Sequence, residues 1–375
     1  MIDIARKILL HDKLRFVITV SGVTFAVTLV LVQMGLFRGI LSHASITIEK
    51  ANAGLWVTSR NTANVDFCGT FSEHYLHRIR SVPGVARADN LIVWYLRLRL
   101  PTGASEGVML YGLKDFTGWN IPWQLAAGDL TKLRCGNYLF LDASGIRRFG
   151  PFAVGDFREI MGRRMKIIGL TREAESFTTT PVGFVDFQRL QEMDPYNLKG
   201  KTTYVLVRLA PGADLSTVRQ EIQKRLPYND VRTQAEWVSI SRRYWVVSTG
   251  LGLNMFLTVF LGCLVGVVIV AQTLYTSTLD HYREFATVKA IGGSNADIYR
   301  ILIKQAVLAA VAGFAAGWML SYAVRPVMAK LGLTVGIDPR FVGLVFIGTV
   351  VLCVSASLVS FRKVATMDPV LVFRA

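Results

Sequence analysis

The chain has 375 residues, of which 52% are hydrophobic and only 18% charged, and its formal net charge is +16. A charged fraction below the roughly 25% of soluble domains argues against a wholly soluble protein. Residues 39–245 carry 27 Lys/Arg against 19 Asp/Glu, and the rest of the chain carries 15 against 7. Basic residues near the ends of apolar runs are typical of contact with anionic lipids. The charge within residues 39–245 is scattered and lacks an interleaved aromatic stripe, so we do not expect nucleic-acid binding.

Four stretches without Asp, Glu, Lys or Arg are each long enough for a membrane-spanning helix, which takes about 20 apolar residues. They cover residues 16–37, 246–279, 305–324 and 341–361. One precedes and three follow a long polar region. The sequence therefore predicts an α-helical membrane protein with four transmembrane helices, one plus three, and a large α+β extracytoplasmic domain between the first and second.

The expected segments follow from these runs. Transmembrane helices are expected at 16–38, 246–274, 304–325 and 341–361. The segments between and around them are an amphipathic cytoplasmic N-terminal helix at 1–15, a periplasmic α+β domain at 39–245, a cytoplasmic coupling segment at 275–303, a periplasmic loop at 326–340 and a cytoplasmic tail at 362–375.

The basic residues before the first span predict the orientation. Arg6, Lys7, Lys13 and Arg15 precede it, and positive charge near a span end stays in the cytoplasm. Both termini are then cytoplasmic in a multi-pass membrane protein. The first apolar run exceeds the roughly 7–15 residues of a signal peptide's apolar region, which favours an uncleaved anchor.

The periplasmic domain shows two β-α-β patterns. Strands at 54–59 and 85–100 flank a helix at 71–80, and strands at 203–209 and 231–233 flank a helix at 214–226. We therefore expect a split ferredoxin-like, porter-type subdomain from 39–100 and 202–245, with a mostly β lobe inserted at 101–201. Strands at 138–141, 165–170 and 182–185 belong to that lobe.

Signatures of catalysis are missing from the sequence. There is no Gly-x-Ser-x-Gly elbow, no phosphate-binding Gly-x-x-x-x-Gly-Lys-Ser/Thr loop and no zinc-type Cys/His spacing. We expect no catalytic residue, no metal and no cofactor in this chain. A disulfide between Cys68 and Cys135 stays open, because sequence does not give their separation.

Small residues recur at four-residue spacing in the spans. Such pairs let helices approach closely in lipid, where packing drives association. The expected helix-packing residues are Gly35, Gly39, Gly262, Gly266, Gly313 and Gly317.

The segment after the second span carries the most specific motif. Residues 275–293 read YTSTLDHYREFATVKAIGG, in which paired glycines end a helix. This resembles the motif ending in Lys-Ala-Ile/Met-Gly that follows the second span of MacB/FtsX-type ABC transporter permeases, and its form is most similar to their DevC-like branch. The resemblance covers the whole chain, including a closing MDPVL at 367–371.

The resemblance implies a transport subunit and not an enzyme. It places the chain in the bacterial inner (plasma) membrane. It implies a homodimer that binds a separate cytoplasmic ABC ATPase, which holds ATP and Mg²⁺, and that works in efflux with a periplasmic membrane-fusion protein and an outer-membrane duct. The residues implied in ATPase coupling are Asp280, Glu284, Phe285, Ala286, Lys289, Ala290, Gly292 and Gly293.

Two other functions stay open within this family. One is an FtsX-like transmembrane signalling protein that regulates a periplasmic partner and transports nothing. The other is extraction of lipoproteins by a Lol-type permease. The sequence does not identify the transported substrate, the fusion protein or the outer-membrane partner.

Overall fold

The computed structural model describes residues 13–177, 180–281, 284, 287, 294–330, 333 and 335–365. It divides into two compact units. Residues 1–39 and 252–375 form one, which we call the membrane unit, and residues 40–251 form the other, which we call the inserted domain. Each is described separately.

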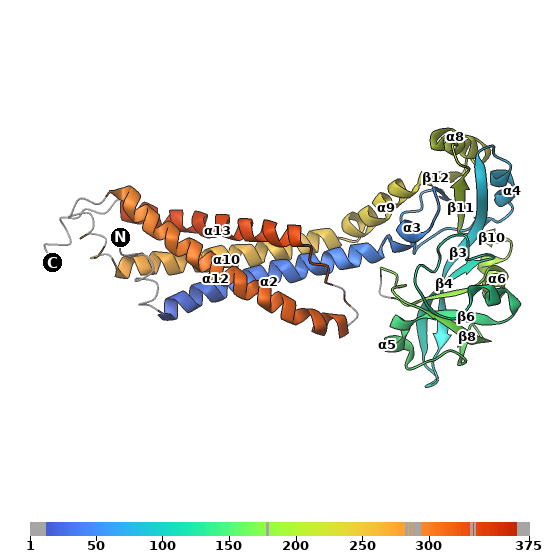
Figure 1. Ribbon diagram of the computed structural model, residues 1–375, viewed down its shortest axis with the longest axis horizontal. Helices are drawn as coiled ribbons and strands as arrows, with labels where there is room; N and C mark the ends of the chain where they lie inside the picture. The colour runs from blue at the N-terminus through green and yellow to red at the C-terminus, as the bar shows by residue number, and fades with distance from the viewer. Residues whose placement is uncertain are drawn as a thin grey trace. The chain divides into compact units, whose positions relative to one another are not determined.

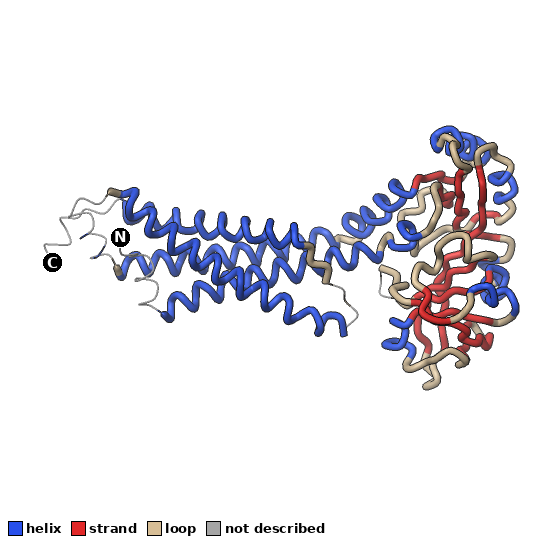
Figure 2. Tube along the Cα trace, in the orientation of Figure 1, coloured by secondary structure: helices blue, strands red, loops and turns tan. Residues whose placement is uncertain are grey.

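The membrane unit consists of long helices (Figures 1 and 2). They are α2 (Lys13–His43), α10 (Leu251–Asp280), α12 (Asn295–Lys330) and α13 (Pro339–Ala365). Each contains a window apolar enough to cross a membrane. Their shared core contains Val27 and Leu31 of α2 and Val270 of α10. One span before the inserted domain and three after it confirm the predicted fold class.

All four helices differ from the predicted span bounds, and α10 and α12 differ most. The expected helix start at residue 246 is wrong, because Tyr244–Ser248 form a π-helical turn and Gly250 has φ of +70°, so α10 begins at Leu251. A glycine in the left-handed region interrupts a helix without changing hydropathy, so the helix break cannot be predicted from the uncharged run. The third helix extends beyond 304–325 at both ends. Its earlier start is explained by Ser294, which caps it: the Asp297 amide donates to Ser294 Oγ over 3.3 Å.

The inserted domain contains a four-stranded antiparallel sheet in the order β12-β1-β11-β3. Its strands are β1 (Leu55–Ser59), β3 (Val85–Arg99), β11 (Tyr204–Leu209) and β12 (Asn229–Thr233). Helices α4 (Tyr75–Arg80) and α8 (Leu215–Arg225) supply Ile79, Val218 and Ile222 to the core on one face of this sheet. With each helix linking two strands, this is the ferredoxin-like split β-α-β arrangement.

The second part of the sheet continues from β3 without a break, so both parts form one ten-stranded sheet. Its order from β3 is β4-β9-β6-β8-β5, and β7 pairs with both β3 and β8. The bounds are β4 (Ser105–Leu113), β5 (Leu125–Ala127), β6 (Tyr138–Asp142), β7 (Phe157–Ile160), β8 (Arg163–Thr171) and β9 (Val182–Asp186).

Short helices complete the inserted domain. Among those between β5 and β10 are η1 (Leu130–Cys135), η2 (Ala143–Gly145), α5 (Ile146–Phe149), α6 (Phe187–Met193) and α7 (Pro195–Leu198). At the two ends of the domain, α3 (Ile46–Lys50) and α9 (Gln234–Arg243) pack against each other. Trp237 of α9 joins Trp56 and Tyr204 of the sheet in a buried core.

One predicted helix is partly wrong. Of residues 71–80, Phe71–Ser72 form β2, which pairs with β10 (Lys201–Thr202), and only Tyr75–Arg80 are helical. Strand β4 was not predicted. Its residues from Gly107 to Leu113 are all buried, so the alternation that marks a half-exposed strand is absent.

Candidate functional site

The predicted coupling segment is described only at its edges. Asp280 ends α10, and Glu284 is helical. The other expected coupling residues lie outside the described residues; they are Phe285, Ala286, Lys289, Ala290, Gly292 and Gly293.

Asp280 forms an ion pair with Arg15, near the start of α2. The Arg15 side chain is 34% exposed and that of Asp280 53%. Exposed pairs contribute about 0–1 kcal/mol, so this contact matters more for position than for stability. It joins the first span to the end of the second, where the coupling motif begins.

Glu284, one of the implied coupling residues, makes a contact within the chain. Its Oε1 lies 3.0 Å from Nδ1 of His281, one helical turn earlier. The Glu284 side chain is nevertheless 59% exposed. It can therefore still meet a partner protein.

Four of the six predicted packing glycines, Gly262, Gly266, Gly313 and Gly317, lie at close contacts between helices of the membrane unit. A Cβ at Gly313 would lie 2.5 Å from Val23 Cβ, and one at Gly317 would lie 2.8 Å from Val27 Cβ, so α12 approaches α2 closely. Beside them, the Thr24 hydroxyl donates to the Gly313 carbonyl and the Thr28 hydroxyl to the Gly317 carbonyl, each over 3.3 Å.

Gly262 and Gly266 lie where α10 approaches α2, whereas Gly35 meets the segment before α13. A Cβ at Gly266 of α10 would lie 2.8 Å from Ala26 Cβ, and one at Gly262 would lie 2.9 Å from Leu29 Cδ2. Gly35 accepts a hydrogen bond from the amide of Gly336 at 3.0 Å, and Gly39 is buried. Backbone approach of this kind is how helices associate where lipid surrounds them.

A polar clamp joins the two ends of the inserted domain. Arg242 of α9 donates to Glu49 Oε1 over 2.6 Å and to Ser45 Oγ over 2.9 Å. The Ser241 hydroxyl donates to the carbonyl of Ala44 over 2.7 Å, and the Gln234 amide reaches the carbonyl of Ile48. We call Ser45, Glu49, Ser241 and Arg242 the root clamp.

The root clamp was not predicted. Arg242 and Glu49 are 193 residues apart in sequence, so no local pattern pairs them. The only local signal is the capping box of α9, in which Thr233 and Glu236 exchange hydrogen bonds with each other's backbone amides. That signal could have located the helix but not its partner.

Asp66 is a buried carboxyl of the inserted domain. Its pKa is raised from 3.8 to about 7. Burial is the cause, and a hydrogen bond from the backbone of Phe177 offsets part of that effect. Within the described part of the chain its Oδ2 has no hydrogen-bond partner. Phe177 in turn stacks on Trp245 of the π-helical turn, with ring centroids 3.6 Å apart.

Three further groups near Asp66 are hard to ionise. Burial raises the pKa of the Cys68 thiol to about 12, and it raises the pKa values of Tyr111 and Tyr204 above their ordinary range. Cys68 is a free thiol that donates to the carbonyl of Val93, whereas the side chain of Cys135 is not described. A thiol held neutral is a poor nucleophile. Within the described ranges, no three His, Cys, Asp or Glu side chains converge as metal ligands.

Two family models match the chain. The MacB-like periplasmic core domain matches residues 16–225, and the FtsX-like permease C-terminal model matches residues 256–369. The first covers the first span and most of the inserted domain. The second covers the remaining spans and the coupling segment.

Relatives of similar length are ABC transporter permeases. One from Mycobacterium tuberculosis is 27% identical over 368 residues, with 96% of each chain covered. A second from that organism is 24% identical over 366 residues, with the same coverage. One from Methanocaldococcus jannaschii is 21% identical over 189 residues, which cover 48% of this chain and 46% of the relative.

Solved structures similar to the chain are extracytoplasmic domains. The periplasmic region of MacB from Actinobacillus actinomycetemcomitans aligns with a TM-score of 0.39 and 9% identity, over 50% of this chain and 92% of that one. The extracellular domain of the transporter YknZ from Gram-positive bacteria aligns with a TM-score of 0.37 and 16% identity, over 48% and 99%. The MacB-like model alone spans more than half of the sequence, and this chain therefore belongs to the MacB/FtsX family of ABC transporter permeases.

Proposed function

We propose that this permease is the membrane subunit of an exporter that transmits ATP-driven movement from one side of the membrane to the other. An ABC permease works with an ATPase subunit, which here would hold ATP and Mg²⁺. Two copies of the chain would bind the ATPase in the cytoplasm. The inserted domain would lie outside and move substrate outward with a membrane-fusion protein and an outer-membrane duct.

The proposed orientation rests on charge. Lys13 and Arg15 begin α2, and the basic residues before them add to the same end. Positive charge of this kind keeps a span end in the cytoplasm. Four spans then return the C-terminus to the cytoplasm and leave the inserted domain outside.

The observation that carries the proposal is the set of contacts at the two ends of α2. This helix runs from Lys13 to His43 and contains no proline. Near its start, Arg15 pairs with Asp280 at the beginning of the coupling motif. Just beyond its last residue, Ser45 and Glu49 enter the root clamp. A continuous helix with a contact at each end suits the transfer of a displacement along its axis.

The chain also passes between the two units in the segment from α9 to α10, and this segment is not a continuous helix. Between α9 and α10 the backbone passes through a π-helical turn and then through Gly250 in the left-handed region. Such a position absorbs changes in backbone direction at low cost. We therefore assign transmission to α2 and adjustment to the segment around Gly250.

A test of the proposal targets the coupling segment. Gly292→Pro removes the glycine at the predicted helix stop, and Glu284→Lys reverses one exposed charge. Both variants should insert normally and keep the inserted domain folded, yet lose the ATPase subunit on copurification or lose substrate-stimulated hydrolysis. Proline fixes the backbone and costs about 3 kcal/mol or more inside a helix, so its effect should be the larger.

The outcome that contradicts the proposal is retention of both properties by Gly292→Pro.

The genes next to the permease gene distinguish export from FtsX-like signalling. An adjacent ATPase gene with a fusion-protein gene supports export, whereas an ATPase gene alone beside a cell-division gene supports signalling.

A further inference from the structure

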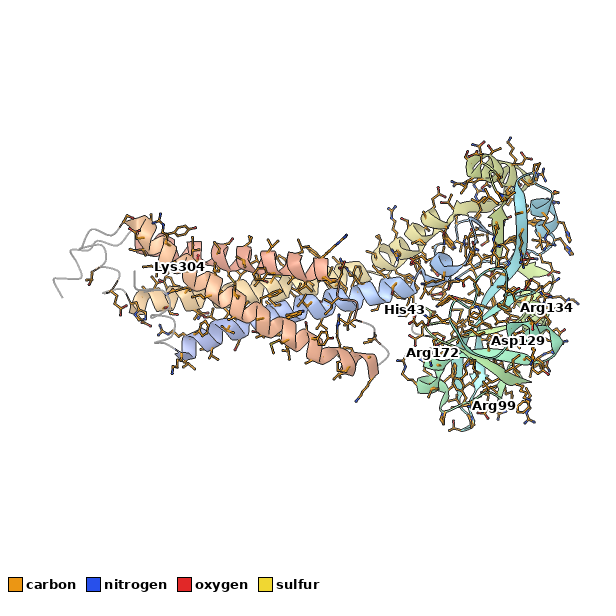
Figure 3. All side chains as sticks on the ribbon, in the orientation of Figure 1. His43, Arg99, Asp129, Arg134, Arg172 and Lys304 are labelled. Atoms are coloured by element: carbon orange, nitrogen blue, oxygen red, sulfur yellow. The ribbon has the colours of Figure 1, made fainter. Side chains whose placement is uncertain are left out.

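One face of the inserted domain's sheet is left uncovered at the far end of β3. Alternation along this strand places Leu96 and Leu98 in a buried core, and Tyr95, Arg97 and Arg99 on the opposite side. Figure 3 labels Arg99 at the periphery of the domain. The sheet is therefore packed on one face here and exposed on the other.

Strand register brings more side chains to the exposed side. Arg99 is opposite Glu159 of β7, Glu159 is opposite Arg164 of β8, and Phe157 is opposite Lys166. Residues directly opposite each other in an antiparallel pair point to the same face. We call this surface the basic face; it consists of Tyr95, Arg97, Arg99, Phe157, Arg164 and Lys166.

The charges of the basic face are largely uncompensated. Arg99 lies 3.6 Å from Glu159, the one carboxylate that the register places on this face. As far as the structure describes the chain, Arg97, Arg164 and Lys166 have no ion-pair partner. The basic face therefore carries four cations and one carboxylate. The sequence does not predict this cluster, because its residues come from three strands.

Two exposed aromatic rings lie among these cations. Tyr95 is 55% exposed and Phe157 45%. The guanidinium of Arg164 lies 4.1 Å from the centre of the Phe157 ring. The Tyr95 hydroxyl lies so close to Gly107 that an added Cβ there would be 1.8 Å from it, so this ring lies flat on the sheet.

We infer that the basic face is the docking surface for an acidic segment of a partner protein. Arginine and aromatic residues are the types enriched at protein interfaces, and a cationic surface selects an anionic partner. Three of the four cations are arginines, whose planar fork pairs with carboxylates through two hydrogen bonds.

A lipid surface suits this face less well. Aromatic residues that anchor a protein to a bilayer insert their rings, whereas the Tyr95 ring lies against the sheet. The inference rests on the proposed function only in placing a partner protein beside the inserted domain.

Photocrosslinking in cells that make the whole transporter tests this inference. Replacing Phe157 with p-benzoylphenylalanine puts an aromatic crosslinker on the basic face. It should form an adduct with a protein whose crosslinked peptide is rich in Asp and Glu. Adding Arg97→Glu and Lys166→Glu should lower the yield about tenfold, because two attractive charges become repulsive.

A matched control changes the same net charge elsewhere. Arg60→Glu with Lys224→Glu alters two exposed cations away from this face and should leave the adduct unchanged. Gly107→Ala tests the ring position without changing charge and should lower the yield, because the new methyl displaces Tyr95. Replacing the acidic residues of the crosslinked peptide with Lys should restore the adduct to the Arg97→Glu, Lys166→Glu variant.

Several outcomes would overturn the inference. They are an adduct unaffected by the charge reversal, a crosslinked peptide without acidic residues, an adduct with lipid alone, or no adduct in cells whose transporter hydrolyses ATP. Normal ATPase coupling without the adduct would reject only this inference. An acidic adduct without ATPase coupling would reject only the proposed function.

Discussion

Asp66 makes the stability of the inserted domain depend on pH. Its pKa is 3.8 when unfolded and about 7 when folded, so between these values the folded state holds a proton that the unfolded state releases. Stability is therefore greatest below pH 3.8 as far as this group is concerned, and it falls as pH rises toward 7. The slope is at most about 1.4 kcal/mol per pH unit.

Asp66→Asn should remove this contribution. Thermal unfolding of the purified permease, followed by tryptophan fluorescence between about pH 5 and 7, should show a smaller decline for the variant than for the natural chain. Asp129→Asn is the control, because Asp129 is exposed and hydrogen bonds to Thr131 lower its pKa, below this range. Equal pH profiles for Asp66→Asn and the natural chain would contradict the assignment.

Two glycines of the membrane unit, Gly313 and Gly343, allow a matched comparison of crowded and open positions. Gly313→Leu places a side chain where even a Cβ would lie 2.5 Å from Val23, whereas Gly343→Leu adds one where nothing lies within 4 Å. Overpacking costs about 1–3 kcal/mol, so only Gly313→Leu should lower the melting temperature in detergent. Equal melting temperatures would mean that α12 does not depend on close approach to α2.

At the level of elements, the root clamp holds α3 and α9 together. Arg242→Ala removes donors to Glu49 and Ser45. Because the Arg242 and Glu49 side chains are 42% and 43% exposed, the cost is about 1 kcal/mol. Hydrogen exchange at the backbone amides of α3 and α9 should then become faster, because local opening costs less free energy.

Arg243→Ala is the neighbouring control for the clamp. Arg243 is exposed on the same helix, and the described residues include no ion-pair partner for it. Its replacement should leave exchange in α3 and α9 unchanged. Faster exchange in both variants alike would show that the clamp contributes nothing specific.

The spans and most strands follow from local sequence patterns, and the remaining elements do not. Uncharged runs predict four membrane helices because lipid excludes charge. Alternation predicts β3, whose two faces differ in burial, but it misses β4, which is buried along most of its length. The helix break at Gly250 escapes prediction because it depends on a backbone angle and leaves hydropathy unchanged.

The candidate sites divide in the same way. The coupling segment stays a prediction, and it could be made because its motif is continuous in sequence. The root clamp and the basic face were not, because folding assembles each from residues that are distant in sequence. Those contacts exist only once strand register and helix packing are set.

For the whole molecule, the central claim is that ATP hydrolysis on one side of the membrane moves the inserted domain on the other. The measurement uses the complex of permease and ATPase in lipid nanodiscs, with a spectroscopic label at Lys224 in each of two copies; this side chain is 76% exposed. Adding ATP and Mg²⁺ should change the distance between the two labels, and Gly292→Pro should abolish that change. An unaltered distance in the natural complex during ATP hydrolysis would contradict the account.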